Sequence, residues 1–219
     1  MPYASGYPWS MLPACLLALV AGYADTVGYL RYDAFAGLMT GNTILLGIDV
    51  ANGRAPSAAF HGGIIAVFLA GVIASRVLLQ LRHAAWLALT VAAILLVVCS
   101  FIGRFWAAML LAFAMGMQNS AANRFNGVAL NTVFITGNLQ KLGEGLTHWV
   151  WRICGRPIEK SEGVAIFASI WIAYAIGAGL GALGEMLLRW PLLLPAALLP
   201  FVMMQSDALP SLRKRRERG

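Results

Sequence analysis

Two stretches of the chain share one pattern, and that pattern decides its organisation. They read ALVAGYADTVGYLRYDAFAGLMTGNTILLG (residues 18–47) and AFAMGMQNSAANRFNGVALNTVFITGNLQKLG (residues 112–143). The matched positions are Gly22 with Gly116, Asp25 with Asn119 and, after a two-residue insertion, Thr40-Gly41-Asn42 with Thr136-Gly137-Asn138. A shared tripeptide with flanking matches predicts an internal two-fold repeat. We take residues 1–103 as the first half, 104–208 as the second, and 209–219 as a basic tail of the same membrane domain.

Composition excludes most classes of soluble protein. Hydrophobic residues make up 60% of the 219 residues, charged residues only 11%, and the mean hydropathy is +0.74. A soluble domain is about 45–50% apolar and about 25% charged. We therefore do not expect a soluble enzyme, a nucleic-acid binder or a disulfide-stabilised secreted domain. We expect a protein embedded in the lipid bilayer.

Long apolar segments predict an all-α integral membrane protein with about six transmembrane helices. Each is close to the ~20 residues that a helix needs to cross the hydrocarbon core, and no strand-like alternation favours a barrel. The segments are 9–31, 58–80, 84–103, 105–124, 163–187 and 189–207.

Two further apolar segments, 34–49 and 128–146, are short and are interrupted by the Thr-Gly-Asn motifs. If they re-enter the membrane without crossing it, each half has three spans and the two halves are inverted. If they cross, the chain has eight spans and parallel halves. Their length favours six spans.

Charge distribution predicts the orientation and argues against nucleic acid as a partner. Basic residues cluster in the tail, at Arg213, Lys214, Arg215, Arg216 and Arg218. The positive-inside rule places such a tail in the cytoplasm. We therefore expect a multi-pass protein with a cytoplasmic C-terminus.

Asp25 is the strongest single candidate for function. It lies within the first span, where a carboxylate costs about 2.5–3.5 kcal/mol or more near the centre of a helix. We expect it to face the protein interior, as a proton or cation site. The structural alternative is a hydrogen bond to a neighbouring helix, or an ion pair with Arg31 or Arg124. Its repeat counterpart Asn119 is the neutral isostere.

The Thr-Gly-Asn motifs are the second candidate site. Thr40 and Thr136 are residue types that cap helices, and Gly41 and Gly137 allow a close approach by a backbone or a ligand. A helix that starts at membrane depth offers unpaired N–H groups to an anion or a polar solute, with Asn42 and Asn138 beside it. Interrupted segments at matching positions mark transporter binding sites. The alternative is a helix-packing motif.

Other polar positions are less specific. Gln118 and Asn119 serve ligand contact or interhelical hydrogen bonding equally well. We expect Glu185 to pair with Arg189, four residues away, and His61 to lie at the membrane interface.

The motifs AGYADTVGYL, LMTGNTILLG, AMGMQNSAANR and FITGNLQKLGEGL resemble the YoaK-like family of small bacterial membrane proteins. The resemblance covers nearly the whole chain. It implies an integral protein of the bacterial inner membrane with about six spans, and it supplies no substrate or activity.

We therefore predict a secondary transporter or facilitator of a small polar or anionic solute, coupled to protons through Asp25, with its site at the repeat interface. The alternative is a non-catalytic assembly or regulatory protein whose polar motifs pack helices. Because six spans make a small membrane domain, we also expect a homodimer. No catalytic set, metal site or cofactor motif can be assembled, so an enzyme is not expected.

Overall fold

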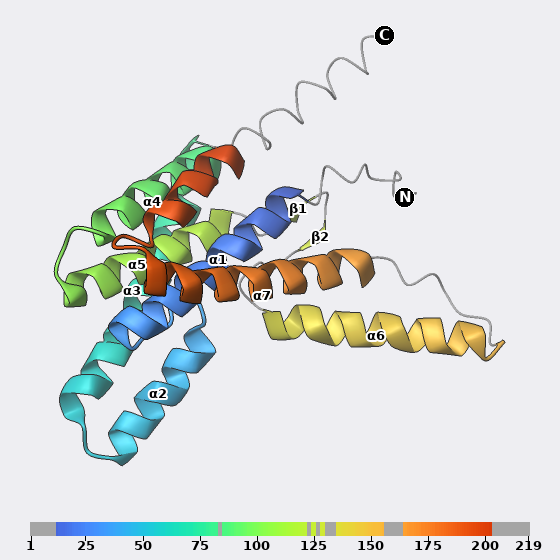
Figure 1. Cartoon of the computed structure of the whole chain (residues 1–219), viewed down its shortest axis with the longest axis horizontal. Coiled ribbons are helices and arrows are strands. Elements are labelled where there is room, and N and C mark those ends of the chain that lie inside the picture. The colour runs from blue at the N-terminus through green and yellow to red at the C-terminus, as the bar shows by residue number, and fades with distance from the viewer. Residues whose placement is uncertain are drawn as a thin grey trace, which may run out of the picture.

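Helices account for nearly all of the described chain. The computed structural model describes residues 12–82, 85–121, 124–125, 128–129, 135–155 and 164–202. Its helices are α1 (Leu12–Tyr32), α2 (Met39–Ala51), α3 (Ala55–Arg82), α4 (Ala85–Cys99), α5 (Arg104–Ala121), α6 (Ile135–Ile153), α7 (Val164–Leu187) and a C-terminal helix, Leu193–Val202 (Figure 1). A short antiparallel pair, β1 (Arg124–Phe125) and β2 (Val128–Ala129), follows α5.

Each of the six long apolar segments contains one helix, and each Thr-Gly-Asn segment contains another. Within the described residues, three helices are long and apolar enough to cross a bilayer by length and composition: Leu12–Tyr32, Ala55–Leu81 and Val164–Leu187. Trp86–Cys99 and Leu193–Val202 are apolar but shorter. The all-α membrane class is supported. The basic tail, 209–219, lies outside the described residues.

Contacts between helix ends show that the long helices alternate in direction. Arg31, at the end of α1, pairs with Glu185 near the end of α7 at 2.8 Å, and Asp33 pairs with Arg104 at the start of α5. Phe101, just after α4, lies against Trp190, just before the C-terminal helix. We call this end of the bundle the Arg31 end.

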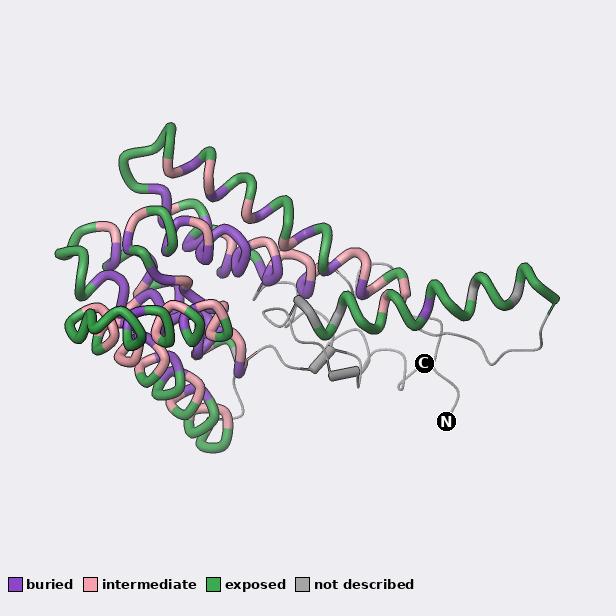
Figure 2. The backbone as a smooth tube through the Cα atoms, turned by 90° about the horizontal axis from the view of Figure 1, so that it is seen from below, coloured by how far each residue is buried: buried purple, intermediate pink, exposed green. Residues whose placement is uncertain are grey.

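Burial is greatest in the two helices at the centre of the bundle. Most residues of α1 and α5 are buried, whereas α3, α4 and α7 carry large exposed apolar side chains. Figure 2 shows the buried residues gathered toward the middle of the helix bundle and the exposed ones on its outside. Examples are Ile73 of α3 and Ile176 of α7, at 55% and 52% exposed. An apolar exterior of this kind is stable in lipid, where apolar side chains need not be removed from the solvent.

Glycines allow α1 to cross α7 at backbone contact. A Cβ atom on Gly22 of α1 would overlap the carbonyl oxygen of Tyr174, and one on Gly177 of α7 would overlap the carbonyl oxygen of Leu19. The two contacts are reciprocal. Gly22 lies three residues after Leu19, whose carbonyl Gly177 meets, and Gly177 lies three residues after Tyr174, whose carbonyl Gly22 meets. Small residues permit such close packing in membranes, where dispersion contacts replace the hydrophobic effect as the driving force.

The crossing of α5 with α3 repeats this arrangement. Gly116 of α5 lies against the carbonyl oxygen of Phe68, and Gly71 of α3 lies against that of Phe113. The three-residue spacing is the same on both helices. In both crossings, the first long helix of one sequence half therefore packs on the second long helix of the other half.

The short helices α2 and α6 form hairpins with α3 and α7. Figure 1 shows the α2–α3 hairpin at the lower left and the α6–α7 hairpin at the right. The Thr-Gly-Asn motif has the same register in both, because α2 begins at Met39 and α6 at Ile135, directly before the threonine. The helix α6 is mostly exposed, with Leu142 packed against α1 and α7.

Candidate functional site

The carboxylate of Asp25 is buried inside the bundle and accepts three hydrogen bonds. Asp25 lies seven residues before the end of α1, about 10 Å along the helix, and is 3% exposed. Its Oδ1 accepts from the backbone N–H of Gly37 at 2.5 Å and of Leu38 at 3.1 Å, and its Oδ2 accepts from the Tyr174 hydroxyl at 2.7 Å. The expectation of a buried and partnered carboxylate is confirmed.

These bonds place an anion at the start of α2. Leu38 is the N-cap of this helix and makes no capping hydrogen bond through its side chain. The Asp25 carboxylate, from α1, instead accepts from the N–H groups of Leu38 and of Gly37 directly before it, at the positively polarised start of α2. The prediction that Thr40 caps this helix is wrong, since Thr40 lies within the first turn and is exposed. The anion expected at this helix start is the protein's own.

The chain reaches Asp25 by turning back along α1. Ala34 N–H donates to the carbonyl of Gly28 at 3.5 Å, and Gly28 lies against the backbone of Ala34 and Ala36. A side chain at position 28 would therefore push this returning segment away. The segment thus runs from the Arg31 end back to the depth of Asp25, and α2 leads out again.

Asn42 and Gly41 fix the same turn. The Asn42 side chain is fully buried, accepts from Phe35 N–H at 2.9 Å and donates to Phe35 C=O at 2.8 Å. A Cβ on Gly41 would meet the Phe35 ring at 2.7 Å. Asn42 and Gly41 are therefore engaged in holding Phe35, and Asn42 uses both ends of its amide to do so.

A second group of buried polar side chains lies at the end of α5. Gln118 is fully buried and donates from Nε2 to the carbonyl of Leu17 in α1 at 2.9 Å. Its Oε1, the Oδ1 of Asn119 and the Oγ of Ser120 are buried and find no hydrogen-bond partner in the described part of the chain. Buried oxygens of this kind cost about 1–3 kcal/mol each unless something binds them.

The second Thr-Gly-Asn motif is only partly described. Gly137 is exposed, and a Cβ there would meet nothing within 4 Å. The side chains of Thr136 and Asn138, and that of Arg124, lie outside the described residues. The expected contact of Asn138 with a solute therefore stays a prediction.

The ion pairs near the Arg31 end differ from those expected. Arg31 donates from Nε to Glu185 at 2.8 Å, so it is not the partner of Asp25. The predicted pair of Glu185 with Arg189 is wrong, because Arg189 lies over the ring of Trp190, 5.0 Å from its centroid. Both arginines thus lie at the boundary of the bundle.

A buried pair of Asp49 and His61 was missed by the sequence reasoning. Asp49 lies in the last turn of α2. Its Oδ2 is 2.8 Å from Nδ1 of His61 in α3, and its Oδ1 is 2.8 Å from the guanidinium of Arg54. The other ring nitrogen of His61 lies 3.0 Å from the carbonyl of Asp33. His61 is buried in the protein, at 7% exposed, and its expected position at the membrane interface stays a prediction. The sequence signal that could have predicted this pair is an aspartate and a histidine on either side of the short turn between α2 and α3.

A family model described as "Protein of unknown function (DUF1275)" matches residues 13–205, which include the Asp25 turn and both Thr-Gly-Asn helices. The chain belongs to the DUF1275 family. This DUF1275 chain is 27% identical to the UPF0700 transmembrane protein YoaK of Bacillus subtilis (strain 168), over 78% of this chain and 81% of that protein. No solved structure matches it.

The DUF1275 match and the similarity to YoaK together confirm the resemblance drawn from the motifs. It supports a transmembrane protein and leaves activity unassigned, because the family and the Bacillus relative carry no activity in their descriptions. A function for the DUF1275 chain must therefore come from the residues themselves.

Proposed function

We propose that the chain is a proton-coupled secondary transporter or facilitator of a small polar or anionic solute. The main observation that supports this proposal is a difference between Asp25 and its repeat counterpart, Asn119. In the first half, Asp25 is buried with three hydrogen-bond donors on its carboxylate. In the second half, its counterpart Asn119 and the neighbouring Gln118 and Ser120 hold buried oxygens without partners among the described residues. The Asp25 carboxylate therefore has its donors in place, and in this proposal the buried oxygens of the second half bind the ligand.

Two inverted halves with six spans are part of this proposal. The reciprocal glycine contacts of α1 with α7 and of α5 with α3 support the repeat, because each contact recurs at equivalent positions. The return of the chain to Asp25 before α2 supports a re-entrant first segment. Inverted repeats with broken helices at the site are a common transporter plan.

The ligand chemistry follows from the first half. There, a carboxylate occupies the start of a Thr-Gly-Asn helix. Asn119 carries no charge, so an anionic group of the solute would take the corresponding place at the start of α6, beside Thr136, Gly137 and Asn138. The unpaired oxygens of Gln118, Asn119 and Ser120 would accept hydrogen bonds from the solute. A small molecule with both an anionic group and donors, such as an amino acid, fits this set best.

Asp25 is the coupling group in this proposal. A protonated carboxyl group would hold the N–H groups of Gly37 and Leu38 less strongly, because a charged acceptor makes roughly twice as strong a hydrogen bond. Binding of a proton would then loosen the turn at the start of α2. The fixed contacts of Asn42 with Phe35 would keep the rest of the turn in place.

A thermal-shift experiment on the purified protein tests the ligand site. Glycine carries an anionic group and donors, acetate carries only the anion, and ethanolamine lacks the anion. We expect glycine to raise the melting temperature most, since a ligand at 100 times its Kd adds about 2.7 kcal/mol to stability. Asn119→Asp should abolish the response, because its carboxylate would occupy the site.

The matched control is Asn52→Asp, which makes the same change at an exposed position of the turn after α2. Its response should equal that of the wild type. An undiminished glycine response in Asn119→Asp would contradict the site. The absence of any response to the three probes would favour the non-catalytic assembly role, to which the fully engaged Asn42 also points.

Sidedness of the two hairpin tips tests the inverted six-span topology. We expect the loops 50–57 and 147–162 on opposite sides of the membrane. Ala55→Cys reports the first loop in a background without the native cysteines, and the exposed native Cys154 reports the second in a background without Cys15 and Cys99. An impermeant maleimide applied to vesicles of known orientation should label only one of the two; labelling of both from one side would require eight spans.

A further inference from the structure

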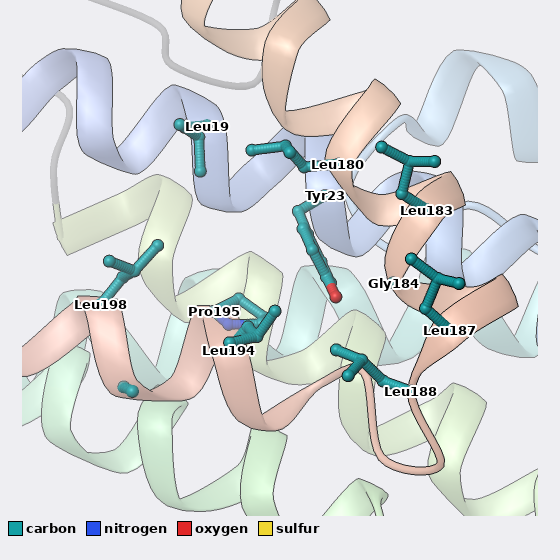
Figure 3. Close-up of a pocket in the computed structure, with 11 residues that line it drawn as sticks. Leu19, Tyr23, Leu180, Leu183, Gly184, Leu187, Leu188, Leu194, Pro195 and Leu198 are labelled. Carbon is teal, nitrogen blue, oxygen red and sulfur yellow. The ribbon is translucent and has the colours of Figure 1, made fainter.

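An apolar groove opens between α1, α7 and the C-terminal helix. It has a volume of about 490 Å³ and is lined mostly by leucines, together with Tyr23, Gly184, Pro195 and Ala197 (Figure 3). Its walls include Leu19 of α1, Leu183 of α7 and Leu198 of the C-terminal helix. Such a lining takes an alkyl chain and offers almost nothing to a water-soluble ligand.

One polar atom in this groove lacks a partner. Tyr23 is 3% exposed, and its buried hydroxyl has no hydrogen-bond partner in the part of the chain that the structure describes. Figure 3 shows the hydroxyl pointing between α7 and the C-terminal helix, next to Gly184. A Cβ on Gly184 would overlap this oxygen, so the glycine makes room for it. A buried tyrosine hydroxyl normally binds an acceptor.

The depth of the hydroxyl indicates which acceptor. Gly184 lies three residues before the end of α7 at Leu187, about 4.5 Å along the helix. Beyond that end lie Arg189 and Trp190, with the guanidinium over the ring. A tryptophan and an arginine at a helix end mark the membrane–water interface. Ester carbonyls of phospholipids lie at this boundary, between the hydrocarbon core and the headgroups.

We propose that this groove binds one phospholipid molecule. An acyl chain lies along the leucines, its ester carbonyl accepts a hydrogen bond from the Tyr23 hydroxyl, and its phosphate lies near the exposed guanidinium of Arg189. The groove does not include Asp25 or Gln118. The proposal of a lipid site is therefore independent of the proposal of transport.

Native mass spectrometry of the full-length protein tests the site. The delipidated protein is titrated with palmitoyl-oleoyl-phosphatidylglycerol, and one tightly bound lipid is expected. Tyr23→Phe should weaken binding about fivefold, the effect of one hydrogen bond. Arg189→Gln should weaken it by a similar factor, about that of one basic residue near an anionic headgroup. Tyr29→Phe, at a tyrosine 45% exposed on the same helix, should bind like the wild type.

An ether-linked analogue isolates the carbonyl contact. It lacks the ester carbonyl, so the wild type should bind it about fivefold more weakly than the ester lipid, and Tyr23→Phe should bind both lipids equally. Leu183→Trp should fill the groove and remove the tight site, whereas Ile176→Trp should not. Leu183 and Ile176 both belong to α7 and are both 52% exposed, but only Leu183 lines the groove.

Three outcomes would overturn the proposal. One is equal affinity of the wild type for ester and ether lipids. Another is lipid retention in Leu183→Trp equal to that of Ile176→Trp. The third is the absence of any tightly bound lipid in the wild type. Melting temperatures measured on every variant separate a lost site from a lost fold.

Discussion

Asp25→Ala should destabilise the protein more than any other single side-chain truncation in α1. The change leaves the N–H groups of Gly37 and Leu38 and the Tyr174 hydroxyl without their acceptor in a buried place. Removal of one partner from a buried charged interaction costs about 3–5 kcal/mol. We expect this loss in equilibrium unfolding of the detergent-solubilised protein, with the turn at residues 33–38 opening first.

Asp25→Asn separates the coupling role from the structural one. The amide oxygen keeps an acceptor for Gly37 and Leu38, so we expect a loss of only about 1–2 kcal/mol, the difference between a charged and a neutral acceptor. Proton-coupled uptake should nevertheless disappear, because the amide does not titrate. Full uptake in this variant would refute the coupling role. Asp33→Asn, at an exposed carboxylate that pairs with Arg104, is the control and should leave stability within about 1 kcal/mol.

Gly22→Ala should be the second largest effect, although it adds only one methyl group. The new Cβ would overlap the Tyr174 carbonyl oxygen, a backbone atom that cannot move without shifting α7. We expect a loss of about 3 kcal/mol or more, measured as a lowered melting temperature in detergent. Gly116→Ala should behave alike, because its Cβ would overlap the carbonyl oxygen of Phe68 in the other crossing.

A glycine of the same helices outside the crossings provides the control. Gly179 of α7 has no neighbour within 4 Å of an added Cβ. Gly179→Ala should be neutral or stabilise the protein by up to about 1 kcal/mol, because alanine has the higher helix propensity. A loss in Gly179→Ala equal to that in Gly22→Ala would show that the effect is not one of helix crossing.

The sequence predicted the helices well because membrane helices follow from composition and length. Every apolar segment corresponds to a helix, and the shared Thr-Gly-Asn motif marks the start of α2 and of α6. It could not predict which helices cross. The packing of α1 on α7 joins residues about 150 positions apart, and no local pattern encodes a pairing at that distance.

The burial of Asp25 could be predicted from the sequence, and its contacts could not. A carboxylate is costly in lipid, which indicated that Asp25 is buried, but its acceptor role toward Gly37 and Leu38 depends on the chain turning back beside Gly28. The amide of Asn42 was expected to meet a solute and instead holds Phe35. The pairing of Asp49 with His61 was not predicted, because the two residues meet only when α2 folds against α3.

The crossing of α1 with α7 also sets an order of events during biosynthesis. Asp25 enters the membrane early, yet Tyr174, which donates to its Oδ2, follows 149 residues later. At a synthesis rate of about 5–20 residues per second, α1 waits about 7 to 30 seconds for its partner helix. During that interval the glycine face of α1 is uncovered and Asp25 lacks one of its donors. The nascent first half is therefore an incomplete bundle, and the last third of the chain completes the first helix.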